Sequence, residues 1–312
     1  MSFTVSRHPH DRARYSRELI VTPAARVGFE LLLETEWTAE RGRILLPAYI
    51  GLSPVEGSGV FDPIGKVGAT YAFYGLHGDL TVDLRSLEGA LSEGPTFAVF
   101  LIHYFGFPQP ALLAIRELCD AHGVLLIEDC AHCLLGLEQE LPVAEVGDYA
   151  LFSFHKVLGC DRGGALQLGG ARDPERFAGC RHSLDVETLA VVAGARVDRI
   201  REHRRAAYQA IADQVVGLSG VRLLHPTLPA GVAPLNLPVL IEGRDRFEVY
   251  KAMRAAGVGV IACYHTLIPP ISAEGWPVSH RIARTILNLP IHQDVLPEHH
   301  GLVVHALGAA LR

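Results

Sequence analysis

Residues 110–129 read PALLAIRELCDAHGVLLIED, and this stretch predicts a helix followed at once by a buried strand. Proline opens the segment, apolar residues recur at helical spacing, and Gly123 follows the last of them as a C-terminal cap. The run VLLIED (124–129) then has the composition of a buried strand, as does TFAVFLI (96–102) before the helix. Strand, helix and strand in this order form a βαβ unit, which predicts an α/β fold with a parallel sheet.

Further apolar runs extend the predicted sheet and then give way to a second, smaller domain. YALFSF (149–154) and ALQL (165–168) suit strands of a sheet that is covered on both faces. The last third of the chain predicts helices at 198–215 and 245–257 and strands at 221–224, 235–241 and 258–264. We therefore expect a large α/β domain over residues 1–197 and a small α+β domain over residues 198–312.

Composition and charge exclude several classes of protein. The chain has 312 residues, of which 49% are hydrophobic and 20% charged, as expected of a folded protein with a substantial core. A net charge of −6 gives no general basic field for nucleic acid; we interpret the arginine-rich REHRRAAYQ (201–209) as a solvated helix face, with a local basic patch as the alternative. The N-terminus has no leader-like apolar region and no long apolar run follows, so we expect a cytoplasmic protein without a membrane partner.

The six cysteines show no spacing typical of a disulfide framework. Four of them stand in apolar runs, where a free cysteine packs as a small hydrophobic residue. The pair in CAHC (130–133) has no second pair at ligand spacing, so we expect no metal site there.

An acid and a lysine are delivered to the same edge of the predicted sheet. Asp129 ends one predicted strand, His132 follows it, and Ser153, His155 and Lys156 lie at the end of another strand. Ligands of such sheets bind beyond the carboxyl ends of the strands. Taken singly, an aspartate after a strand is commonly a turn residue and a lysine a solvated charge, so the signal lies in their joint position.

Pyridoxal phosphate (PLP) catalysis requires this combination of an amine and a carboxylate. A lysine amine forms a Schiff base with the cofactor aldehyde, and a buried carboxylate keeps the pyridine nitrogen protonated so that the ring accepts electrons. Asp129 would be the carboxylate. Lys156 would be the tether and, once a substrate amine displaces it, the base that moves a proton between carbon atoms. Gly163 and Gly164 would let the backbone pass close to the ring.

The same region resembles a known family. LLIEDCAHCLLG (125–136) followed by VGDYALFSFHKVLGCDRGGAL (146–166) is similar to the motifs of the DegT/StrS-type sugar aminotransferases. Three further segments match that family, namely RILLPAYIG (43–51), VFLIHYFGFPQP (99–110) and ILNLPIHQDVLPEH (286–299). The resemblance implies a fold-type-I PLP-dependent transferase, with a mostly parallel, seven-stranded type of central sheet, helices on both faces and a smaller C-terminal α+β domain.

Carried over to this sequence, the resemblance implies that Lys156 binds the cofactor covalently and that Asp129 holds its pyridine nitrogen. His132 would contact the cofactor ring or its 3-oxygen. Where many members place an aromatic residue after Pro-Ala-Tyr to stack on the ring, this chain has IGL, so stacking would come from Tyr49, His132 or another residue. Lys156 follows His155 directly, whereas the family commonly has two residues between them, but the glycine pair keeps its place.

The resemblance also implies where the cofactor phosphate binds. The family has a short Ser-Gly-Thr/Arg turn that opens a helix, and AARVGFELLL (24–33) occupies its place. The backbone amides of Arg26 and Val27 would hold the phosphate at the helix start, and the Arg26 guanidinium would add a charged fork. The hydroxyl of Ser153 would donate to the same phosphate.

The expected substrates follow from the same resemblance. His103, Tyr264 and His265 are the candidate substrate contacts. We expect an aminotransferase that moves an amino group from glutamate or glutamine to a keto sugar or another small biosynthetic carbonyl compound. We also expect a homodimer, because the family builds each site from two chains, although the loop that completes the partner's site is shortened between residues 180 and 200. Two alternatives remain open: another PLP reaction, such as elimination or racemisation, and a degenerate PLP-binding homologue that acts through protein contacts.

Overall fold

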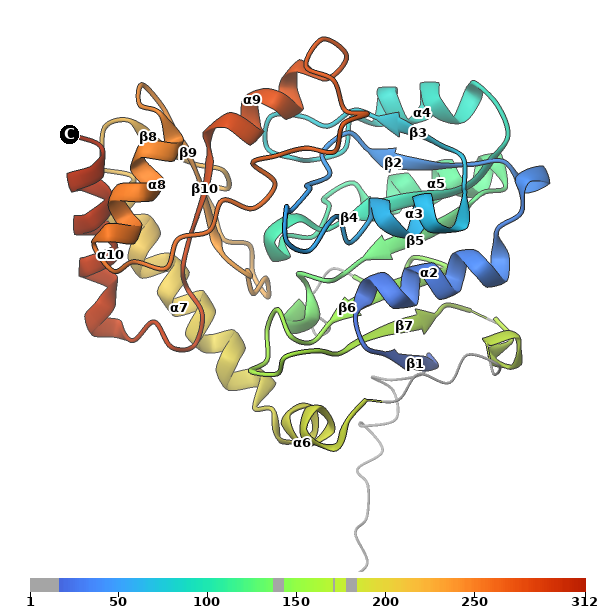
Figure 1. Ribbon diagram of the computed structural model, residues 1–312, viewed down its shortest axis with the longest axis horizontal. Coiled ribbons are helices and arrows are strands. Elements are labelled where there is room, and N and C mark those ends of the chain that lie inside the picture. The colour runs from blue at the N-terminus through green and yellow to red at the C-terminus, as the bar shows by residue number, and fades with distance from the viewer. Residues whose placement is uncertain (1–16, 137–142, 171, 178–183) are drawn as a thin grey trace, which may run out of the picture.

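A seven-stranded sheet forms the centre of the computed structural model, which describes residues 17–136, 143–170, 172–177 and 184–312 (Figure 1). Its strands run in the order β1-β7-β6-β5-β4-β2-β3. They are β1 (Leu19–Thr22), β2 (Arg43–Pro47), β3 (Tyr71–Tyr74), β4 (Thr96–Ile102), β5 (Leu125–Asp129), β6 (Tyr149–Ser153) and β7 (Gly164–Leu168). The ladders from β3 to β6 are parallel, and β7 and β1 pair antiparallel at the other edge. The predicted mostly parallel sheet is therefore confirmed.

Helices cover both faces of this sheet, as predicted (Figure 1). One face carries α2 (Ala25–Glu36) and α3 (Phe61–Val67), and the other carries α4 (Leu84–Ser92) and α5 (Leu112–His122). Short 3₁₀ turns are η1 (Ala39–Arg41), η2 (Tyr104–Gly106), η3 (Leu134–Gly136) and η4 (Pro174–Phe177).

The central βαβ unit forms for the reasons that its sequence indicates. Every residue of β4 after Thr96 is buried, as expected of a strand covered on both faces. Gly123 ends α5 with a left-handed φ of 66°, a conformation that glycine adopts without steric cost. The helix begins at Leu112, two residues later than the predicted start at Pro110, because the chain is still in a turn there.

The C-terminal part contains a second, antiparallel sheet in the order β10-β9-β8. Its strands are β8 (Val221–Leu223), β9 (Leu237–Ile241) and β10 (Ile286–Leu289), and its helices are α6 (Val186–Gly194), α7 (Val197–Val215), α8 (Arg246–Ala255), α9 (Pro277–Thr285) and α10 (Pro297–Ala310). One cluster of buried side chains joins the two sheets, so the division at residue 197 stays a prediction. Among the described helices, none combines the length and the apolar composition that crossing a membrane requires.

The strand predicted at residues 258–264 does not form. Ile261 makes one isolated antiparallel bridge with Asn288, and the chain then turns at Tyr264, whose φ of 60° lies in the left-handed region. Val258 and Val260 are buried, so the apolar run reflects a loop that packs into the core. This turn brings Tyr264 close to residues of the large sheet, as the ring contacts below show.

The glycine pair after β6 has a packing role that the sequence did not indicate. A Cβ atom added at Gly164 would lie 2.6 Å from the backbone nitrogen of Ala25 and 2.6 Å from the carbonyl oxygen of Phe152. Real Cβ atoms essentially never approach so closely. Gly164 therefore lets the first turn of α2 pack directly against β7.

Substituting Gly164 with alanine is expected to destabilise the protein by about 1–3 kcal/mol, because backbone atoms on both sides must move. Thermal or urea unfolding of the purified variant measures this loss. Gly159→Ala is the matched control, since a Cβ atom there meets nothing within 4 Å. Equal unfolding free energies for the two variants would contradict the packing role.

Candidate active site

The carboxyl ends of β5 and β6 bring the predicted site residues to one edge of the sheet. These two strands are adjacent and parallel; Asp129 is the last residue of β5 and Ser153 the last of β6. His132 lies in the turn after β5 and Lys156 in the turn after β6. The two turns converge, so that Nζ of Lys156 lies 3.1 Å from Nε2 of His132.

The tautomer of His132 follows from the partners of its two ring nitrogens. The backbone N–H of Phe105 donates to Nδ1 at 3.1 Å, so Nδ1 carries no hydrogen. Burial, and then the positive charge of Lys156, lower the pKa of His132 well below its usual range, and the ring is neutral at pH 7. Nε2 therefore carries the hydrogen, which Nζ of Lys156 can accept only when the amine is neutral, because an ammonium has no lone pair. The Phe105 ring stacks on the imidazole with centroids 6.0 Å apart.

Asp129 provides a buried carboxyl group at the same edge. Its side chain is 9% exposed, and Oδ1 accepts a hydrogen bond from the backbone N–H of Ala131 at 2.9 Å. Burial raises the pKa of Asp129, and the charge of Lys156 partly opposes that rise. No side chain among the described residues donates a hydrogen bond to this carboxyl group, so Oδ2 remains available to a ligand.

Aromatic rings from three separate segments enclose this edge of the sheet. Tyr49 lies 5.6 Å from both Tyr104 and Tyr264, measured between ring centroids, and Tyr264 lies 6.1 Å from His132. Sequence reasoning selected Tyr49 and Tyr264 but missed Tyr104, whose hydroxyl donates to the carbonyl oxygen of Tyr49 at 2.7 Å. The hydroxyl of Tyr49 is buried and, among the described residues, has no partner.

The start of α2 lies next to the glycine pair and offers few side chains. Its N-cap residue, Ala24, makes no side-chain cap, and the described residues provide no acceptor for the backbone N–H of Arg26. The Arg26 guanidinium donates to the carbonyl oxygen of Glu56 at 2.6 Å. The backbone N–H of Val27, which was predicted to bind the phosphate, instead donates to the carbonyl oxygen of Ala24 at 3.1 Å within the first turn.

Ser153 interacts with His155, which lies two residues later in the sequence. Its Oγ lies 3.2 Å from Nδ1 of His155. Burial, followed by the charge of Lys156, lowers the pKa of His155, and Arg26 contributes in the same direction. The side chain of His155 therefore belongs to the polar group between the end of β6 and the start of α2.

Two predicted substrate contacts lie elsewhere. His103 is 0% exposed; its Nδ1 accepts from the backbone N–H of Gln109 at 3.0 Å, and its Nε2 lies 2.9 Å from Oε2 of Glu128. No ring nitrogen is left for a substrate. His265 is exposed, and Nδ1 of its ring forms a hydrogen bond with the carbonyl oxygen of Ala262 in the same turn. Of the three candidates, Tyr264 alone joins the aromatic group around His132.

Behind this edge, His103, Glu128 and Cys130 offer ligand atoms within 4.8 Å of one another. The backbone N–H groups of Ala144 and Gly147 donate to the Glu128 carboxylate at 3.0 and 2.5 Å, in addition to its contact with His103. Its two oxygens thus have three hydrogen-bonding partners, which gives Glu128 a structural role in fixing the segment after residue 142.

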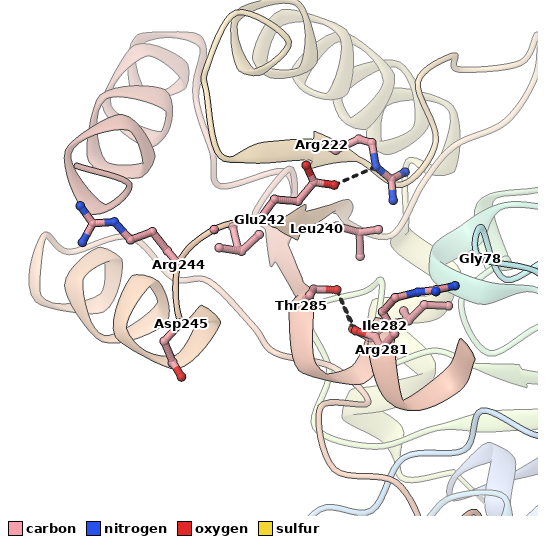
Figure 2. A pocket seen from close by; sticks show the side chains of 11 residues that line it. Gly78, Arg222, Leu240, Glu242, Arg244, Asp245, Arg281, Ile282 and Thr285 are labelled. Carbon is pink, nitrogen blue, oxygen red and sulfur yellow. Dashed lines mark hydrogen bonds and ion pairs between the residues drawn. The ribbon is translucent and has the colours of Figure 1, made fainter. Parts of the chain in front are cut away.

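A hollow of about 510 Å³ lies apart from these residues, against β9, the turn before α8, and α9 (Figure 2). Arg222, Arg244 and Arg281 contribute to its wall, and Arg222 pairs with Glu242 at 3.2 Å. None of the polar residues at the ends of β5 and β6 lines it. The candidate active site is therefore defined by converging side chains at the sheet edge and not by this hollow.

The described residues at the sheet edge fit pyridoxal phosphate. Asp129 offers a buried carboxyl oxygen to a ring nitrogen, and Lys156 offers an amine that has no carboxylate partner among the described residues. The uncapped start of α2 suits an anion because backbone N–H groups and the helix dipole point toward it. A cofactor with an aldehyde, a basic ring nitrogen and a phosphate matches these three features.

Comparison with known proteins identifies the fold and a family profile that matches part of the chain. The fold is that of the solved structure of S. venezuelae DesV in complex with a ketimine intermediate, with a TM-score of 0.75 and 22% identity over 97% of this chain and 88% of that one. Residues 58–181 match the profile of the DegT/DnrJ/EryC1/StrS aminotransferase family.

Curated relatives agree with that family. The chain is 26% identical over 263 residues to UDP-N-acetyl-3-dehydro-alpha-D-glucosamine 3-aminotransferase of Acidithiobacillus ferrooxidans, and the match covers 74% of this chain and 69% of that one. It is 24% identical over 270 residues to the putative L-glutamine:3-amino-2,3-dideoxy-scyllo-inosose aminotransferase of Micromonospora echinospora, covering 72% and 63%. The chain thus spans about two thirds of the length of these relatives. Together the matches support the family predicted from the sequence: over residues 58–181 and along most of its length, the chain is similar to aminotransferases of the DegT/DnrJ/EryC1/StrS type.

Proposed function

We propose that this enzyme is a PLP-dependent aminotransferase that moves an amino group from glutamate or glutamine to a keto sugar or another small carbonyl compound. The observation that carries the proposal is the 3.1 Å approach of Nζ of Lys156 to Nε2 of His132 beside the buried carboxyl group of Asp129. The names of the two relatives, which include an amino sugar, a cyclitol derivative and L-glutamine, support this choice of substrates. The proposal includes a homodimer, which sedimentation equilibrium tests directly.

When bound, pyridoxal phosphate supplies an aldehyde that condenses with an amine and a ring that takes up the electron pair released at the substrate α-carbon. The chain supplies the acid–base groups. Nζ of Lys156 holds the cofactor and afterwards moves the proton between carbon atoms. The Asp129 carboxylate holds a proton on the ring nitrogen, because a negative charge in a buried site favours a cation beside it.

The remaining residues orient these groups and limit access of water. Nε2–H of His132 donates to the lysine nitrogen when that nitrogen has a free lone pair, or to an oxygen placed beside it. Ser153, His155 and the backbone N–H of Arg26 bind the phosphate between the end of β6 and the start of α2. The rings of Tyr49 and Tyr264 form an apolar wall at the site.

The proposed reaction is tested as two half-reactions on the PLP-loaded enzyme. With glutamate or glutamine alone, we expect one equivalent of the corresponding 2-oxo acid per active site and conversion of the cofactor to its pyridoxamine form. Adding a nucleotide-linked keto sugar should then restore the original absorption spectrum and give an amino sugar. Racemised amino acid, or an eliminated product with free ammonia, would replace the proposal with another PLP reaction. A bound cofactor that no amine converts would favour the degenerate homologue.

A further inference from the structure

Helix α7 of the small domain buries an arginine without a carboxylate partner. Arg204 is 2% exposed, and among the described residues no acid lies within ion-pair distance of it. This corrects the interpretation of residues 201–209 as a solvated face, because Ala207 and Tyr208 are buried as well. Burial lowers the pKa of Arg204 to about 10, against the opposing effect of the Asp294 charge, and this leaves Arg204 charged at pH 7. Burial of an unpaired charge is costly, so its hydrogen bonds are of interest.

One hydrogen bond of Arg204 leads to the turn that contains Lys156. Nη2 of Arg204 donates to Oε1 of Gln293 at 3.1 Å, and Nε2 of Gln293 donates to the carbonyl oxygen of Val157 at 3.0 Å. A guanidinium has donors only, so Gln293 must turn its oxygen toward Arg204 and its amide hydrogens toward Val157. Val157 directly follows Lys156.

The other hydrogen bond leads to His132. Nη1 of Arg204 donates to the carbonyl oxygen of Leu235 at 2.6 Å, and the backbone N–H of Leu235 donates to the carbonyl oxygen of Phe105 at 2.7 Å. The N–H of Phe105 is the donor that fixes the tautomer of His132. One guanidinium therefore begins two chains of hydrogen bonds: one ends at the carbonyl oxygen of Val157, the residue after Lys156, and the other ends at the ring of His132, and the side chains of Lys156 and His132 form the 3.1 Å contact.

We propose that Arg204 and Gln293 are positioning residues: from the C-terminal part of the chain, they fix the position of the Lys156 side chain relative to the ring of His132. Neither residue touches the reacting atoms in this proposal. Gln293 orients the backbone of the Lys156 turn, and Arg204 orients Gln293 together with the Phe105 turn. The consequence for catalysis rests on the proposed function. The relative position of the two side chains does not depend on it.

The chain has only three lysines, Lys66, Lys156 and Lys251, which allows a direct test without catalysis. Cofactor-free protein is labelled with acetic anhydride over a range of pH, and peptide mass spectrometry gives the relative rate for each lysine. In Gln293→Glu the side chain still accepts from Arg204 but loses the amide hydrogens that face Val157. Labelling of Lys156 should rise by about fivefold, the equivalent of one hydrogen bond, while the other two lysines keep their rates.

Gln214→Glu is the matched control, because Gln214 is exposed on α7, the helix that carries Arg204, and its side chain donates to the carbonyl oxygen of Ala210 within that helix. In the PLP-loaded Gln293→Glu enzyme we expect kcat to fall by about the same factor while KM for the amino donor stays within about twofold. Arg204→Lys should give the same labelling change, since an ammonium cannot replace the fork to both acceptors.

The results separate this inference from the proposed function. A faster Lys156 label in Gln293→Glu supports the positioning role even if the wild-type enzyme transfers no amino group. An unchanged Lys156 labelling profile in Gln293→Glu overturns the positioning role, whatever reaction the enzyme catalyses.

Discussion

Replacing Lys156 with alanine is expected to lower the rate of amino transfer by about 10⁴-fold or more, because it removes the proposed tether and the proposed base together. The visible absorption band of the PLP-loaded protein should disappear as well. In the wild-type protein, borohydride reduction should fix the cofactor to the peptide that contains Lys156, and mass spectrometry identifies that peptide. The rate is measured with the best donor and acceptor found for the wild-type enzyme.

Two variants separate the chemistry of the amine from its charge. Lys251→Ala is the matched control, since Lys251 is exposed on α8 and pairs with Glu248 at 2.8 Å. Lys156→Arg keeps a positive charge beside His132 but cannot condense with an aldehyde, so it should be as inactive as the alanine variant. Methylamine added to Lys156→Ala should restore a small part of the rate. A spectrum and a rate that do not depend on Lys156 would remove this lysine from the mechanism.

The central strands of the large sheet were predictable because their sequences carry the information locally. β4, β5 and β6 are almost entirely buried, so each lies in a mainly apolar run that ends close to where the sequence predicts. The edge strands β1 and β3 have only four residues each and are partly exposed, and their short apolar stretches, LIVT and YAFY, do not by themselves distinguish a strand. Their positions depend on pairing with distant segments.

The candidate site was predictable only as far as the strand ends. Asp129 and Lys156 were placed by the rule for carboxyl ends of parallel strands. The donor that fixes the tautomer of His132 was not, because it depends on a left-handed turn at Phe105, with a φ of 56°. Tyr264 reaches the site through a loop whose apolar residues resemble a strand.

Arg204 shows a further limit of sequence reasoning. An arginine-rich helix is usually solvated, and the residue type alone does not distinguish the buried Arg204 from Arg201 and Arg205, which are partly exposed. Its partners, Leu235 and Gln293, lie 31 and 89 residues away in the sequence. Burial of this kind follows only from how the C-terminal part packs against the loops of the large sheet.

Replacing Asp129 with asparagine is expected to lower kcat by about 10²–10³-fold, comparable to the loss of one preorganised electrostatic contact in an enzyme site. Asparagine has nearly the same shape, and its amide oxygen can still accept from the backbone N–H of Ala131. It lacks the negative charge that keeps a ring nitrogen protonated, so the bound cofactor becomes a weaker electron acceptor. Asp213→Asn, an exposed position on α7, serves as the control for the purified enzyme.

The stability of Asp129→Asn is expected to increase although its activity falls. A higher Tm together with a lower kcat would exclude misfolding as the cause of the lost activity. Burial raises the pKa of Asp129 in the folded protein above its ordinary value of about 4. The folded state therefore binds the proton more tightly than the unfolded chain, and the cofactor-free wild-type protein loses stability as the pH rises between these two pKa values. Asparagine does not titrate, so the Tm of Asp129→Asn relative to wild type should rise over that interval and then stay constant. An enzyme that keeps its wild-type kcat after this substitution would exclude the Asp129 carboxylate from the proposed role.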